Sequence, residues 1–77
     1  MLALAFKASE TGGTMTAVLN GANEEAVSAF LAGKCRFLDI ADMVEGAMEN
    51  HKTKKNPTLS DIFDADREAR EFVKLKY

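Results

Sequence analysis

The sequence contains few of the residues on which several common protein classes depend. Cys35 is the one cysteine among 77 residues, which excludes an internal disulfide and a cysteine-rich metal site. A single thiol fits a reducing compartment, so we expect a cytoplasmic protein. No apolar run approaches the roughly 20 residues that span a bilayer. The apolar start, residues 1–6, is too short for a signal-peptide core and has no basic region before it.

The chain also lacks an excess of charge of one sign. Its formal net charge is −2, so nothing in the composition favours binding to nucleic acid or to an anionic membrane. Apolar residues make up 47% of the chain, which is ordinary for a folded domain and too high for disorder. A domain of this length buries only about 60% of its unfolded surface. We therefore expect one small domain over residues 1–77, of modest stability.

Four segments carry apolar residues at helical spacing, and no segment alternates as a strand does. These segments are residues 2–11, 15–32, 38–51 and 59–76. Short loops join them, and no repeat, low-complexity tract or long linker divides the chain. The sequence therefore predicts an all-α fold, a compact bundle of four short helices.

Residues that cap helices stand near several of the expected ends. Gly12-Gly13 ends the first helix and Gly33 the second, because glycine reaches the left-handed backbone that a helix stop requires. The start of the second helix is open, since Thr14 can cap the whole segment and Asn20 a shorter one.

The fourth helix has its own start signal. Thr58 followed three residues later by Asp61 resembles a capping box, although aspartate is shorter than the usual glutamate. The pattern leaves open a bend or break near Asp64.

The apolar stripes predict which side chains share a face on each helix. In the third helix the spacing is met without a gap by Ile40, Met43, Val44, Ala47 and Met48. The stripe of the second helix comprises Val18, Leu19, Ala22, Ala26, Val27, Phe30 and Leu31. The first helix presents Leu2, Ala5, Phe6 and Ser9. The fourth presents Leu59, Ile62, Phe63, Asp66, Ala69, Val73 and Tyr77.

Phe30 lies late in the longest of these helices, on its apolar stripe. We expect its ring to be buried. Truncating a buried phenylalanine costs roughly 3–5 kcal/mol, so Phe30→Ala is predicted to be among the most damaging substitutions.

Four polar residues stand close to the expected packing faces. Asn20 and Asn23 either cap and solvate the second helix or bond to the backbone of a neighbouring segment. Asp66 and Arg70 are four residues apart, so their side chains meet on one face of the fourth helix. This pair either lies at the surface, where it contributes little, or is partly buried and fixes the geometry of its surroundings.

The acidic side chains and the histidine show no catalytic or metal-ligating pattern. The aspartates lack a histidine at ligand spacing, so we expect solvated or capping roles for Asp39, Asp42, Asp61, Asp64 and Asp66. His51 has no nucleophile near it in the sequence and is expected to be a helix-end histidine.

Cys35 and the basic loop show no site pattern either. Cys35 lies between Lys34 and Arg36 but lacks a paired base, which favours a passive thiol. The loop lysines lack a glycine-rich turn and interleaved aromatic residues, which favours a solvated role for Lys52, Lys54 and Lys55. The sequence thus offers no catalytic, cofactor-binding or metal-binding residue.

Four blocks of the sequence, in this order and spacing, resemble a known family. They are Leu19-Asn20-Gly21-Ala22-Asn23-Glu24, Ala29-Phe30-Leu31-Ala32-Gly33, Arg36-Phe37-Leu38-Asp39-Ile40 and Asp66-Arg67-Glu68-Ala69-Arg70. Together they resemble the C-terminal helical domain of 1-deoxy-D-xylulose 5-phosphate reductoisomerase, over nearly the whole chain. Gly21 departs from the alanine expected in the family, and should weaken its helix by up to about 1 kcal/mol.

The resemblance implies a parent enzyme with an N-terminal dinucleotide-binding domain and a central catalytic domain as partners of this one. That enzyme converts 1-deoxy-D-xylulose 5-phosphate to 2-C-methyl-D-erythritol 4-phosphate in non-mevalonate isoprenoid synthesis, with NADPH and a divalent metal, Mg²⁺ or Mn²⁺. The motifs for nucleotide, metal and substrate belong to the other two domains, and none matches a position here. The chain alone is therefore expected to be inactive and to bind no cofactor.

Two other functions are compatible with the same sequence. The chain could be a freestanding helical module that binds other proteins, or a small regulatory or ligand-binding bundle. Under the preferred interpretation it braces the parent enzyme, and self-association is open because a separated domain leaves apolar surface uncovered.

Overall fold

The computed structural model describes residues 1–76, and it forms four helices with no strand among them. Their bounds are α1 Leu2–Thr11, α2 Met15–Leu31, α3 Asp39–Asn50 and α4 Leu59–Lys74. The all-α prediction is confirmed, and each predicted boundary lies within two residues of the observed one.

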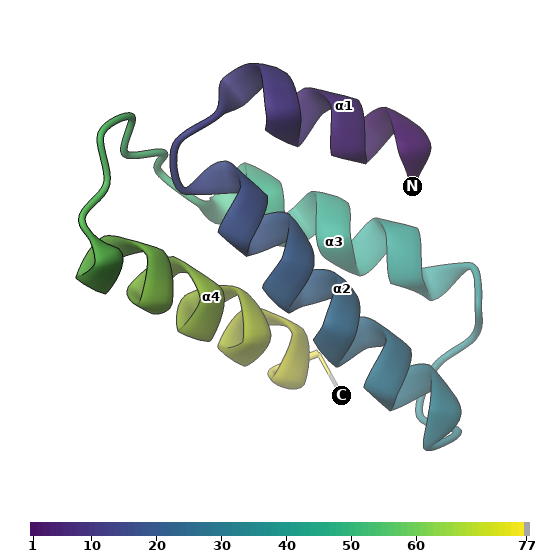
Figure 1. Cartoon of the computed structure of the whole chain (residues 1–77). Coiled ribbons are helices and arrows are strands. Elements are labelled where there is room, and N and C mark those ends of the chain that lie inside the picture. The colour runs from purple at the N-terminus through teal and green to yellow at the C-terminus, as the bar shows by residue number, and fades with distance from the viewer. Residues whose placement is uncertain (77) are drawn as a thin grey trace.

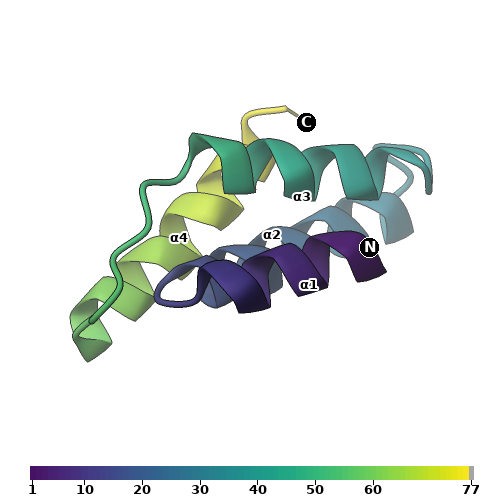
Figure 2. The ribbon, with the colours of Figure 1, turned by 90° about the horizontal axis from the view of Figure 1, so that it is seen from above.

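α2 is the central helix of the bundle and contacts the other three (Figure 1). It runs parallel to α4, since Gly21 faces Asp66 and Glu24, further along α2, faces Arg70. Seen from above, α3 lies along one side of the molecule, while α1, α2 and the first turns of α4 lie on the other (Figure 2). The bundle therefore has an α3 side and an opposite side.

The helix ends follow the predicted chemistry. Gly33 has a φ of 76°, so the α2 stop uses the left-handed backbone that glycine allows. Gly13 has a φ of 56° and also passes so close to the Lys54 carbonyl that a Cβ has no room. The capping box is confirmed, since Asp61 N donates to Thr58 Oγ1 at 3.1 Å and Thr58 N to Asp61 Oδ2 at 3.0 Å. α4 continues without a break through Asp64.

The core lies where α2, α3 and α4 meet. The stripe predicted for α3 is confirmed in full, because all five of its side chains are buried. Against it pack Val18, Ala22 and Ala26 of α2, and Ala65, Ala69 and Val73 of α4. The many alanines let the helix backbones approach closely, which small apolar residues permit and large ones prevent.

The faces predicted for α1 and α4 need correction. Leu2 and Phe6 are exposed, and Ala8 is the buried side chain of α1. On α4, Leu59 and Phe63 are exposed, and Ala65 joins Ala69 and Val73 in the core. Tyr77, predicted for the same face, lies outside the described residues. Alanines take most of the buried positions of both helices, and the larger Leu4 and Phe72 pack half-buried against the core.

The prediction for Phe30 is also wrong. Its side chain is 36% exposed, and its ring meets Phe37 edge-on at 5.7 Å between centroids. The last turn of α2 projects beyond its neighbours (Figure 1), so Leu31 is exposed as well. Because the ring buries less surface than a core phenylalanine, its truncation should cost less than the roughly 3–5 kcal/mol of a buried ring.

Candidate functional site

Arg70 joins three carboxylates where α4 meets α2. Its Nε lies 3.0 Å from Oδ2 of Asp66, so the spacing prediction of a contact is met. Its Nη2 lies 2.6 Å from Glu24 Oε2, and its Nη1 lies 3.8 Å from Glu25 Oε1. Donating hydrogen bonds to the carboxylates of Asp66, first, and Glu24 raises the pKa of the guanidinium, which stays charged. The cluster thus ties two helices together rather than one helix to itself.

The exposure of this cluster is intermediate. The side chain of Arg70 is 32% exposed and that of Asp66 37%. Sequence reasoning missed Glu24 and Glu25, because 46 residues separate Glu24 from Arg70. The sequence feature that could have indicated these contacts is the pair of glutamates one turn after Gly21, on the flank of α2 that faces α4.

Gly21 sets how closely the two helices approach. A Cβ on this residue would lie 2.6 Å from Oδ1 of Asp66 and 2.9 Å from the backbone oxygen of Asp66. Neither distance is compatible with a real side chain, so α4 rests on α2 at a spacing that only glycine permits. The close approach also places Asp66 and Arg70 within reach of Glu24.

The two amides predicted as polar candidates lie apart from this cluster. Asn20 is exposed and Asn23 half-buried. Within residues 1–76, neither side chain makes a hydrogen bond. Asn20 does not cap α2, because the helix begins at Met15 after Thr14 and runs through residue 20.

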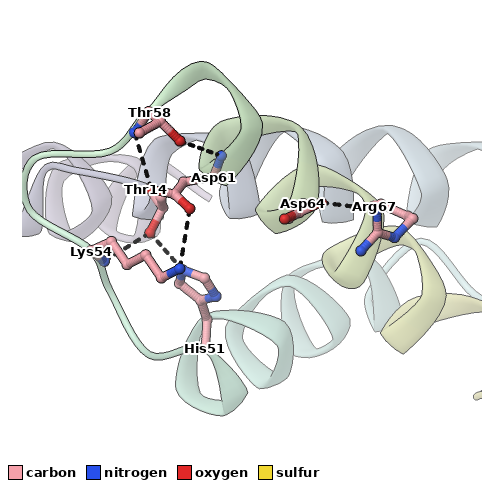
Figure 3. A network of polar contacts seen from close by, with 7 residues as sticks. All are labelled: Thr14, His51, Lys54, Thr58, Asp61, Asp64 and Arg67. Carbon is pink, nitrogen blue, oxygen red and sulfur yellow. Dashed lines mark hydrogen bonds and ion pairs between the residues drawn. The ribbon is translucent and has the colours of Figure 1, made fainter.

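A second polar network surrounds Thr14, which is 1% exposed (Figure 3). Its hydroxyl lies 2.7 Å from Nε2 of His51 and accepts the backbone N–H of Lys54 at 3.0 Å. The backbone N–H of Thr14 donates to the carbonyl of Lys54 at 3.1 Å. Thr14 therefore fastens the start of α2 to the loop after α3. Sequence reasoning missed this role, since 40 residues separate Thr14 from Lys54.

The loop is fastened to α4 as well. Lys54 Nζ lies 3.1 Å from Oδ1 of Asp61, the third residue of α4 and the partner of Thr58 in the capping box (Figure 3). The backbone hydrogen bond from Thr58 and then the side-chain hydrogen bond from Lys54 hold the pKa of Asp61 below its usual range. The side chain of Lys54 is 66% exposed, in agreement with the solvated role predicted for it, and its ammonium also pairs with Asp61.

A cavity of about 340 Å³ lies beside these networks, between α3 and α4. Its walls carry charges of both signs, from Lys52 and Lys54 on one side and Asp64 and Glu68 on the other. A hydroxyl 2.7 Å from an imidazole is the geometry of a nucleophile and its base. Thr14 is only 1% exposed, however, and its hydroxyl already accepts the backbone N–H of Lys54, which favours a structural role for the pair.

The donor set for a metal is lacking in the described part of the chain. Across residues 1–76, no three side chains of histidine, cysteine, aspartate or glutamate converge as metal ligands. The Mg²⁺ or Mn²⁺ implied by the resemblance does not fit these residues. None of the helices described is long and apolar enough to cross a membrane.

The four-helix arrangement has a counterpart among known protein families. The model of the DXP reductoisomerase C-terminal domain matches residues 1–72. The chain belongs to this family. It is 58% identical over 76 residues to the 1-deoxy-D-xylulose 5-phosphate reductoisomerase of Caldanaerobacter subterraneus subsp. tengcongensis, and 50% identical over 72 residues to that of Bacillus subtilis. These matches cover 99% and 94% of the chain.

A solved structure supports the same assignment. The reductoisomerase of Zymomonas mobilis in complex with NADPH superposes on 97% of the chain with a TM-score of 0.88 and 41% identity. The match with this chain covers 20% of the Zymomonas chain, and 20% and 19% of the two enzymes above. About four-fifths of each relative thus has no counterpart here.

We predict that Thr14→Val destabilises this C-terminal domain by about 1–3 kcal/mol, because the Lys54 N–H loses its acceptor and the shape of the side chain is kept. Urea denaturation measures the change. Thr16→Val, at an exposed threonine in the first turn of α2, is the matched control and should change little. Equal stability of the two variants would show that the Thr14 network adds nothing.

We also predict that Asp66 and Arg70 are energetically coupled. A double-mutant cycle with Asp66→Ala and Arg70→Ala should give a coupling of about 0.5–1 kcal/mol, since solvent screens a pair of this exposure in part. The control cycle uses Asp64 and Arg67, which pair at 3.0 Å but are more exposed. A coupling free energy below about 0.3 kcal/mol in both cycles would show that Asp66 and Arg70 interact no more strongly than an ordinary surface pair.

Proposed function

We propose that this chain is the structural C-terminal domain of a 1-deoxy-D-xylulose 5-phosphate reductoisomerase and braces that enzyme without taking part in its chemistry. The observation that carries the proposal is the match over residues 1–72 with a domain that makes up a fifth of its relatives. The polar groups found here support a bracing role, because Arg70 and Thr14 join segments of the chain to one another.

The parent enzyme would supply the reaction. It rearranges and reduces 1-deoxy-D-xylulose 5-phosphate to 2-C-methyl-D-erythritol 4-phosphate, with NADPH as reductant and a divalent metal, in the cytoplasm. The nucleotide, the metal and the substrate would bind to its N-terminal and catalytic domains, which are the partners of this one. We assign Asp66 and Arg70 the part of fixing α4 on α2, and Asn20 and Asn23 no chemical part.

A chimeric enzyme tests this function. The matching C-terminal segment of the Caldanaerobacter enzyme is replaced by this chain, and NADPH consumption is measured with 1-deoxy-D-xylulose 5-phosphate and Mg²⁺. We expect activity within about tenfold of the unmodified enzyme, a difference of roughly 1.4 kcal/mol in the barrier. The same enzyme truncated before this segment should lose activity or solubility.

The isolated chain is the second arm of the experiment. It should show only background NADPH consumption under the same conditions. Turnover by the rigorously purified chain would overturn the proposal that the chemistry lies in other domains. A folded but inactive chimera would overturn the assignment of the chain to this enzyme.

A further inference from the structure

Three helices leave apolar side chains uncovered on one side of the bundle. α1 exposes Leu2 and Phe6, α4 exposes Leu59 and Phe63, and the last residue of α2, Leu31, is exposed. In α1 and in α4 the two exposed residues are four apart, so they form one stripe on each helix. The exposed fractions lie between 61% for Phe6 and 77% for Leu31.

The stripes lie on the side of the bundle opposite α3. On α1, the flank that faces α3 carries Lys7 and Thr11, which share a small groove with Glu45 and Glu49 of α3. Leu2 and Phe6 are on the other flank, by helical spacing. Figure 2 shows α1 and α2 together on this side, across the molecule from α3.

The exposed apolar residues of α4 and α2 also lie on the side opposite α3. On α4, Glu68 and Phe72 line the cavity shared with α3, so Leu59 and Phe63 fall on the opposite flank. On α2, Asn20 and Leu31 are turned away from Val18 and the other buried side chains. The first turns of α4 lie on this same side of the molecule (Figure 2), and α4 packs against α2 there.

The outer surface of α3 has the opposite character. Its exposed side chains include Asp42, Glu45 and Glu49, which are acidic. A helix whose outer face is charged is suited to water, whereas clustered exposed apolar side chains mark a contact surface. The acidic outer surface of α3 is therefore suited to solvent, and the apolar stripes on the opposite side are suited to a partner.

We propose that the remaining four-fifths of the reductoisomerase chain packs on the α1–α2–α4 face, defined by Leu2, Phe6, Asn20, Leu31, Leu59 and Phe63. This inference rests on the proposed function. The length of the relatives indicates what covers this face. Each relative has, besides the matching segment, about four times as many residues as this chain. Asn20, which makes no hydrogen bond within residues 1–76, offers an amide to that surface.

The charges on this face favour the parent chain over a second copy. Glu24 and Glu25 approach Arg70 from α2, and Asp66 from α4, so three acids surround one base. In a symmetric dimer formed through this face, both copies would bring the same acidic excess into one interface. Like charges brought together oppose association. The partner surface on the rest of the reductoisomerase should therefore be apolar and carry a basic side chain facing Glu24 and Glu25.

The test compares two leucines in the chimeric enzyme. Leu31 ends α2 on the α1–α2–α4 face, and Leu75 follows α4 on the flank of Glu68 and Phe72, which faces α3. Both are exposed and both lie at the end of a helix. We expect Leu31→Arg to lower NADPH consumption at least about tenfold, and Leu75→Arg to lower it less than about twofold, because only the first places a charge in an apolar interface. Phe63→Arg should behave like Leu31→Arg.

The isolated chain separates this inference from a folding defect. Circular dichroism melts of the three variants should match that of the unmodified chain, since each side chain is exposed in the free domain. If the unmodified chimera is inactive, the proposed function fails; if it is active and all three variants behave alike, the docking face is wrong. A dimer of the isolated chain, seen by sedimentation and abolished by Leu31→Arg while the chimera is unaffected, would assign the face to self-association and overturn the proposal.

Discussion

The close approach of α4 to α2 at Gly21 is the constraint on which the rest of the bundle depends. The carboxylate and backbone oxygen of Asp66 occupy the space that any side chain at position 21 would need. This spacing lets the alanines of both helices interlock with the stripe of α3, and it brings Arg70 to Glu24. The helix propensity that Gly21 sacrifices, about 1 kcal/mol, is thus offset by contacts that a larger residue would prevent.

The two polar networks complement this contact. The Arg70 cluster holds the middle of α4 against α2, while Thr14 holds the start of α2 to Lys54 and, through it, to the cap of α4. Neither network resembles a catalytic centre, because the buried hydroxyl is closed to solvent and the carboxylates do not converge as a metal site among residues 1–76. Both restrict how the helices can move, which is what a bracing domain requires.

Periodicity predicted α3 well, because one flank of that helix is buried and the other is charged. It failed for Leu2, Phe63 and Phe30, since a stripe states which residues share a face and not whether a neighbour covers that face. The contact of Asp66 with Arg70 followed from a spacing of four residues. The contacts of Arg70 with Glu24 and of Thr14 with Lys54 depend on how distant segments pack, which no local pattern records.

The importance of the α2–α4 contact at Gly21 is tested most directly by comparing the stability of Gly21→Ala and Gly46→Ala in chemical denaturation. Both substitutions gain similar helix propensity. At Gly46 the new Cβ meets only the ring of Phe72, at 3.2 Å, and a half-buried side chain can shift, whereas at Gly21 it meets the backbone of Asp66. We predict that Gly21→Ala is the less stable of the two by about 1–3 kcal/mol, the usual cost of overpacking. If Gly21→Ala is as stable as Gly46→Ala, the close contact of α2 and α4 does not organise this bundle.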